Sequence, residues 1–227
     1  MLEQLISADK RLLLLLNGSD SAFCDHLMLI VTRTSTWIPL ALMLIYVLLK
    51  NNNLRKFALF VLAFTILLLI TDRVSSGIFK PLVHRFRPSH EPSLYGLVDI
   101  CGDYRGGLYG FFSSHAANTF GIMTFVALMF RSYRLTFTLF FWAMLSSYSR
   151  IYLGLHYPGD ILCGALFGLM AGAFVYWLYD YACKRLSSQH VYYSDQYTST
   201  GYLMDDVHLL VATFWLTCII VLIGAVA

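Results

Sequence analysis

Six apolar runs, separated by short polar stretches, constrain the fold of this chain of 227 residues more than any other feature. They cover Leu27 to Leu49, Leu54 to Phe79, Ala116 to Phe130, Leu135 to Tyr152, Ile161 to Tyr179 and Val207 to Ala227. A helix needs ~20 mainly apolar residues to cross the hydrocarbon core of a bilayer. Hydrophobic residues make up 58% of the chain and charged residues 13%, which is too apolar for a soluble domain. The sequence therefore predicts an all-α, polytopic membrane bundle of about six transmembrane helices.

The runs are expected to form one membrane domain over residues 1–227. Residues 1–20 predict an amphipathic helix on the membrane surface, because their apolar stretch is too short for a span or a signal peptide. Residues 27–183 hold five spans, 184–206 predict a polar linker on the inner side, and 207–227 add a C-terminal span. Five scattered cysteines form no close-spaced pair, so neither a disulfide framework nor a zinc site is indicated.

Basic residues predict which side of the membrane each loop occupies. Those between consecutive runs belong on the cytoplasmic side, following the positive-inside rule. They are Lys50, Arg55, Lys56, Arg131, Arg134, Lys184 and Arg185. The opposite side then receives residues 80–115 and the turn around His156. The three clusters that contain Lys80, His115 and His156 all lie on this predicted outer side.

A histidine and an aspartate stand four residues apart where the chain enters the fifth run. A carboxylate near one imidazole nitrogen fixes the tautomer and leaves the other nitrogen free to act as a base or nucleophile. His156 is therefore a candidate nucleophile, and Asp160 is the candidate residue that orients it. The alternative is an N-cap aspartate beside an interfacial histidine.

Three cations accompany this pair on the outer side: Lys80, Arg87 and Arg150. Arginine presents a planar fork to phosphate oxygens, and lysine presents a point charge. Ser113 and the free backbone N–H groups at the start of the third run would complete a site for an anion. A single such cation is more often a snorkelling side chain, so their joint occurrence is what indicates a phosphoryl ligand.

A second histidine, His115, opens the third run. At ~1.5 Å per helical residue, the third and fourth runs return His115 and Arg150 to the same membrane depth. His115 is thus a candidate proton donor to a leaving group, the alternative being a polar interfacial histidine. Two histidines with separate roles remove the need for a metal, so no metal or other cofactor is predicted.

Three motifs in this chain resemble the signature of the type 2 phosphatidate phosphatase (PAP2) superfamily: Lys80, six residues, Arg87-Pro88; Ser113-Ser114-His115; and Ser149-Arg150, five residues, His156, three residues, Asp160. The resemblance implies a helical bundle with an active site on the outer face. It also implies metal-independent hydrolysis of a phosphomonoester or pyrophosphate through a phosphohistidine. The middle motif departs from the family's Pro-Ser-Gly-His, because Phe112 and Ser114 replace the proline and the glycine.

The resemblance also implies individual roles. His156 is expected to be the nucleophile, Asp160 its orienting partner and His115 the general acid. The phosphoryl oxygens are expected to be bound by Lys80, Arg87, Ser113, Ser114 and Arg150. Further candidates for contacts with the substrate headgroup are Arg33, His84, Arg85 and Arg105. For Arg33 the alternative is a snorkelling arginine.

A phosphorylated lipid is the expected substrate, and a bacterial inner membrane with the site facing the periplasm is the expected location. We expect an envelope lipid, either lipid A or undecaprenyl pyrophosphate. Three alternatives stay open: a phosphatidylglycerophosphate or phosphatidate phosphatase, a lipid phosphotransferase, and a non-enzymatic protein that binds or transports lipid phosphates. The net charge of +3 indicates no nucleic-acid partner, and the oligomeric state stays open.

Overall fold

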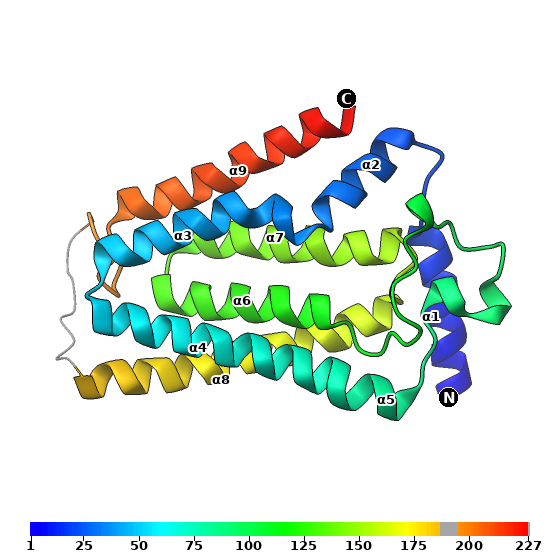
Figure 1. The fold of residues 1–227 in the computed structure, drawn as a ribbon, viewed down its shortest axis with the longest axis horizontal. Helices are drawn as coiled ribbons and strands as arrows, with labels where there is room; N and C mark the ends of the chain where they lie inside the picture. The colour runs from blue at the N-terminus through cyan, green and yellow to red at the C-terminus, as the bar shows by residue number, and fades with distance from the viewer. Residues whose placement is uncertain (187–194, 227) are drawn as a thin grey trace.

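The computed structural model describes residues 1–186 and 195–226, and its elements in these ranges are helices. The long helices lie side by side along one axis (Figure 1). They are α3 (Ile38–Asn51), α4 (Leu54–Asp72), α6 (Ser114–Phe130), α7 (Tyr133–Tyr152), α8 (Pro158–Leu186) and α9 (Met204–Val226). Helix α1 (Leu2–Leu16) crosses one end of this bundle (Figure 1). The all-α fold predicted from the apolar runs is confirmed.

Helix length and composition mark the parts of the bundle that can cross a membrane. Within the described ranges, four segments are long and apolar enough: Thr34–Asn51, Leu54–Val83, Pro158–Leu186 and Met204–Val226. Large apolar side chains such as Leu62, Trp177 and Ile223 are exposed on them, as expected for helices that face lipid. Helix α6 is apolar but has only 17 residues. The total of six spans therefore stays a prediction.

The first predicted span is not one helix, and this is a correction to the sequence prediction. The structure divides it into α2 (Ala22–Val31), the 3-10 turn η1 (Thr34–Trp37) and α3. Pro39 has no backbone N–H to donate to the preceding turn. Side chains after the break satisfy the carbonyls before it. Thr36 Oγ1 donates to the Ile30 carbonyl at 2.6 Å, and Trp37 Nε1 donates to the Val31 carbonyl at 3.0 Å.

Helices α6 and α8 pack closely because α8 presents a row of glycines. A Cβ added to Gly164, Gly168 or Gly172 would collide with backbone carbonyls of the α6 segment. Small residues spaced by four allow two helices to approach in this way. The start of α6 is thereby held against the start of α8, where the backbone N–H of Ser113 donates to the Asp160 carbonyl at 3.1 Å.

The opposite end of the bundle contains most of the predicted polar linker. Its residues 187–194 lie outside the described part of the chain. Among the residues that follow, Asp195, Gln196 and Ser199 are exposed, whereas Thr198, Tyr202 and Asp206 are buried. The Tyr202 ring lies 4.2 Å from the Phe130 ring between centroids, and buried Asp206 accepts hydrogen bonds from Lys50 and Asn51, both at 2.7 Å.

Candidate active site

The three sequence motifs converge at the end of the bundle that α1 crosses (Figure 1). Lys80 begins α5 (Lys80–Val83), the last turn of the long second span. Ser113 caps α6 and Arg150 lies in the last turn of α7. A short connection then carries the chain into α8. Segments far apart in the sequence therefore contribute to one site.

His156 and Asp160 are both buried in this connection and the first turn of α8, with exposures of 1% and 0%. The Nδ1 atom of His156 lies 3.5 Å from Oδ2 of Asp160. The same carboxylate oxygen accepts the backbone N–H of Tyr157 at 3.1 Å. The backbone N–H of His156 donates to the Arg150 carbonyl at 3.2 Å. Nδ1 makes no hydrogen bond to a described residue, but the carboxylate gives it an acidic neighbour, which leaves Nε2 as the nitrogen available for chemistry.

Arg87 and Arg150 are nearly buried, and their contacts are with neutral groups. Arg87 donates to the carbonyls of Tyr109 at 3.3 Å and Leu155 at 3.5 Å. Arg150 donates from Nη1 to the Thr32 hydroxyl at 2.7 Å, and its buried Nε has no hydrogen-bond partner among the described residues. Neither guanidinium has a carboxylate partner within that part of the chain. Buried charges are normally paired, so these two are available to an anionic ligand.

Lys80 and Ser114 join the second span to the start of α6. The Lys80 ammonium donates to the hydroxyls of Ser76 at 3.1 Å and Ser114 at 3.2 Å. Ser114, which replaces the family's usual glycine, therefore supports a cation of the site. Ser113 accepts the Ala116 N–H at 3.3 Å as a helix N-cap, which leaves its own hydroxyl hydrogen free to donate.

The electrostatics of the site favour an anion. Burial lowers the pKa of His156 well below its usual value, and the nearby cations Arg87, Arg150 and Lys80 lower it further. The pKa of Arg87 is lowered by burial and then by Arg150, although an arginine stays charged at physiological pH. A bound phosphoryl group would relieve this repulsion, and His156 would meet it as the neutral imidazole.

His115 connects the site to an apolar cavity inside the bundle. Its Nε2 lies 2.8 Å from the hydroxyl of buried Ser146 on α7. Both residues line a cavity of about 390 Å³ between α3, α4, α6 and α7. The remaining lining is mostly apolar and includes Leu44, Phe64 and Trp142. A group bound at His115 is thus continuous with a space suited to hydrocarbon.

Arg85 was predicted to contact a headgroup, but the structure gives it other partners. One guanidinium nitrogen donates to Asp160 Oδ1 at 2.7 Å, and the other donates to Asp9 Oδ2, also at 2.7 Å. The guanidinium lies 3.9 Å above the centre of the Tyr157 ring. Asp9 comes from α1, and nothing in its local sequence indicated a place beside the site.

The other predicted headgroup residues are spread around the end of the bundle that contains His156, which we call the outer end. Arg33 is exposed at the break after α2, directly following the Thr32 that binds Arg150. His84 is exposed and its ring packs edge-on against Tyr109, with centroids 4.8 Å apart. Arg105 is exposed in the outer loop. It lines a second, more polar hollow together with residues 88–92, 94–96, 98 and 100. The structure does not gather these three into one cluster with His156.

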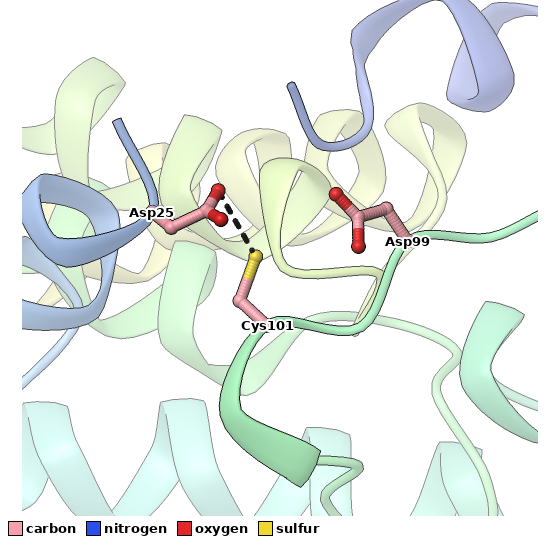
Figure 2. A group of neighbouring side chains, drawn as sticks. All are labelled: Asp25, Asp99 and Cys101. Carbon is pink, nitrogen blue, oxygen red and sulfur yellow. Dashed lines mark hydrogen bonds between the residues drawn. The ribbon is translucent and has the colours of Figure 1, made fainter. Parts of the chain in front are cut away.

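One group of possible metal ligands occurs in the described residues: Asp25, Asp99 and Cys101 (Figure 2). Asp25 already accepts a hydrogen bond from the Cys101 thiol at 3.4 Å and one from the Tyr152 hydroxyl at 2.6 Å. Burial and the Asp25 carboxylate raise the pKa of Cys101 to about 12, so the thiol stays protonated. A protonated thiol is a poor metal ligand. We interpret the group as a contact that fastens the outer loop to α2.

The bundle and the histidine site define a class of protein, a membrane phosphatase that acts on lipids. Comparison with known proteins agrees with this class, because residues 56–184 match the PAP2 superfamily. The chain belongs to the PAP2 superfamily and is a phosphomonoester hydrolase acting on lipids. No solved structure matches it.

Two relatives are similar over most of their length. A lipid A 4′-phosphatase from Bacteroides thetaiotaomicron is 38% identical over 190 residues, covering 83% of this chain and 83% of that protein. A lipid A 4′-phosphatase from Porphyromonas gingivalis is 36% identical over 185 residues, covering 81% of this chain and 78% of that protein. The expected class, a lipid phosphatase of the bacterial envelope, is therefore confirmed.

Proposed function

We propose that this protein removes the 4′ phosphate from lipid A by a metal-independent reaction through a phosphohistidine at His156. The observation that carries the proposal is the set of buried or half-buried cations around His156 that lack a carboxylate partner among the described residues. Three fixed positive charges match the spread of negative charge on a transferring phosphoryl group. Undecaprenyl pyrophosphate, the other expected substrate, would also meet these charges.

The geometry supports separate roles for the two histidines. His156 Nε2 attacks phosphorus, while Asp160 holds Nδ1 and stabilises the positive charge that develops on the ring. His115 donates a proton to the departing sugar oxygen, and Ser146 orients its ring. Water then attacks the phosphohistidine and gives a proton to the now neutral His115. The bond between Nε2 and phosphorus breaks, phosphate is released, and both histidines return to their starting states. Lys80, Arg87 and Arg150 hold the phosphoryl oxygens, assisted by the hydroxyls of Ser113 and Ser114.

The apolar cavity beside His115 supports a lipid substrate. Its volume of about 390 Å³ holds part of an acyl chain while the phosphate lies at the polar end. A water-soluble phosphate ester would leave this cavity unused. The choice of lipid A rests on the two relatives, both of which are lipid A 4′-phosphatases.

We place the site on the periplasmic side of the inner membrane. The basic residues between the spans lie at the opposite end of the bundle from His156 (Figure 1). Their excess at that end favours a cytoplasmic location for it. The test compares two variants at exposed positions, Tyr95→Cys at the His156 end of the bundle and Tyr133→Cys at the opposite end. Intact cells that produce each variant are treated with a membrane-impermeant maleimide. Selective labelling at position 133 would reverse the orientation.

The function is tested by phosphate release from detergent-purified protein in the presence of a chelator. The substrates are lipid A, undecaprenyl pyrophosphate, phosphatidylglycerophosphate and phosphatidate, each with the wild type and with His156→Ala. We expect turnover of lipid A, loss of the 4′ phosphate by mass spectrometry, and a loss of more than ~10³-fold in the variant. Preferred turnover of another lipid would replace the proposed substrate. Full activity of His156→Ala would overturn the mechanism.

A phosphotransferase would use the same residues, with a lipid hydroxyl in place of water. An added acceptor alcohol separates the two reactions. Phosphorylated acceptor as the main product would identify a transferase, whereas inorganic phosphate as the main product supports the hydrolase.

A further inference from the structure

We propose that Asp9 and Arg85 are positioning residues of the active site, so that α1 is a working part of the phosphatase. The inference rests on the proposed function of His156 and Asp160. Neither Asp9 nor Arg85 belongs to the three motifs. Together they form a continuous chain of contacts from α1 to the nucleophile.

The first contact in this chain holds the orienting carboxylate. Asp160 is fully buried, and each of its oxygens is used. Oδ1 accepts from Arg85 at 2.7 Å, while Oδ2 accepts from the Tyr157 N–H and faces His156. Without Arg85, Oδ1 would lose this charged partner, and a buried carboxylate without its partner is costly. Arg85 therefore sets both the charge and the orientation of Asp160.

The second contact holds Arg85 itself. Its guanidinium is fixed from two sides, by the Asp9 carboxylate at 2.7 Å and by the Tyr157 ring 3.9 Å away. A planar guanidinium can bridge two carboxylates at once, which a lysine ammonium on the same stem does less well. A side chain that is fixed from two sides can in turn hold a neighbouring catalytic group in its productive geometry.

The third contact docks α1. The other oxygen of Asp9 accepts the backbone N–H of Gly159 at 2.8 Å, at the start of α8. A carboxylate is stabilised there by the positive end of the helix dipole. A Cβ at position 159 would lie 2.8 Å from Asp9 Oδ2, so this close approach depends on glycine. Asp9 thus connects α1 both to the helix that carries Asp160 and to the arginine that holds it.

Kinetics of Arg85→Gln, Arg85→Lys and Asp9→Asn test the proposal. The matched controls are Glu3→Gln and Arg11→Gln, which make the same chemical changes at exposed positions of α1. We expect Arg85→Gln to lower kcat by ~10 to 100-fold with KM changed less than about threefold, as is typical for loss of a supporting partner. Arg85→Lys should restore part of kcat, Asp9→Asn should lower it about three- to tenfold, and the controls should match the wild type.

The pH profile separates positioning from a merely structural role. His156 is faced by Lys80 from the second span, Arg87 from the outer loop, Arg150 from α7, His115 from α6 and Asp160 from α8. Loss of the Arg85 cation removes a positive charge from the surroundings of His156, which favours protonation of its imidazole. The acid limb of kcat/KM should therefore move to higher pH in Arg85→Gln and stay in place in Arg11→Gln.

Three outcomes decide the proposal. A kcat near the wild-type value in Arg85→Gln and Asp9→Asn would overturn it. A rise in KM with unchanged kcat would also overturn it, and would indicate that Arg85 contacts the substrate headgroup. If Arg85→Gln does not fold, Gly159→Ala decides, because its added methyl group displaces Asp9 without removing any ionisable side chain from the protein. Loss of activity in His156→Ala together with normal Arg85 and Asp9 variants would overturn this inference and leave the proposed function standing.

Discussion

The two ends of the bundle, the outer end that contains His156 and the inner end that contains Asp206, both bury charged groups. Only the outer end also buries cations that have no carboxylate partner among the described residues. At the inner end, buried Asp206 is held by Lys50 and Asn51, both at 2.7 Å. At the outer end, Arg87 and Arg150 contact carbonyls and a hydroxyl instead of a carboxylate. Paired groups contribute to the stability of the fold, whereas cations held together without an anion indicate a ligand. The difference separates structure from function within one bundle.

The largest effect expected from this comparison is on catalysis at the outer end. Arg150→Gln should lower kcat/KM by ~10² to 10³-fold, because one preorganised donor to the phosphoryl group is lost. The unfolding midpoint should stay near that of the wild type, since the change also removes a repulsive charge. Phosphate release and thermal unfolding in detergent measure the two effects. Arg55→Gln, at an exposed inner position, is the control. A large loss of stability with normal turnover would mean that Arg150 is a structural residue.

The inner end should respond in the opposite way. Asn51→Leu removes the hydrogen bond to Asp206 and should lower the free energy of unfolding by about 1.5 to 3 kcal/mol, the usual range for a hydrogen bond to a charged group. Asp206→Asn should act in the same direction. Asp205→Asn, exposed at the neighbouring position, should have little effect. We expect kcat/KM to be unchanged in all three at temperatures where they are folded. If the variants at the Asp206 end lost activity but kept their stability, the distinction between a structural end and a functional end of the bundle would be wrong.

The cavity between the two ends should affect substrate choice. Leu44→Trp reduces the space beside the apolar lining and should lower kcat/KM for a long-chain lipid about tenfold. A short-chain, water-soluble phosphate ester should be turned over at the wild-type rate. Leu42→Trp, on the exposed side of α3, controls for the added ring. Equal losses for both substrates would show that the cavity does not hold the chain.

The smallest expected effect is a difference between two pH profiles, that of kcat/KM, which reports the free enzyme, and that of kcat, which reports the enzyme–substrate complex. His156 must be neutral to attack, and its pKa is lowered in the free protein, so the acid limb of kcat/KM should lie below the usual histidine value of ~6.5. A bound phosphate adds negative charge and raises the pKa of His156, so the acid limb of kcat should lie at higher pH. Both pH profiles are corrected for ionisation of the substrate phosphate, which occurs near ~pH 6. If the acid limbs of kcat and kcat/KM coincided above ~pH 6.5, the result would contradict the proposal that the cluster of cations lowers the pKa of His156.

The sequence predicted the site better than the contacts that hold it in place. Spacing within motifs and the length of the runs placed His115, Arg150 and His156 at one end, because helix rise converts residue number into depth. The break after α2 was missed because Leu27 to Leu49 is apolar overall, while the break depends on local hydrogen bonds of Thr36 and Trp37. Asp9 was missed because its partners lie 76 and 150 residues away and no local pattern records such contacts.

The position of α1 has a consequence for how the enzyme is made. Helix α1, which holds Asp9, leaves the ribosome before Gly159 and Asp160, which are added only after α1 to α7 have been synthesised. Helix α1 therefore cannot complete its contacts until the start of α8 has been synthesised. A bulky tag fused before Leu2 would hinder that late docking, so a protein that is well folded and abundant could still be a poor catalyst.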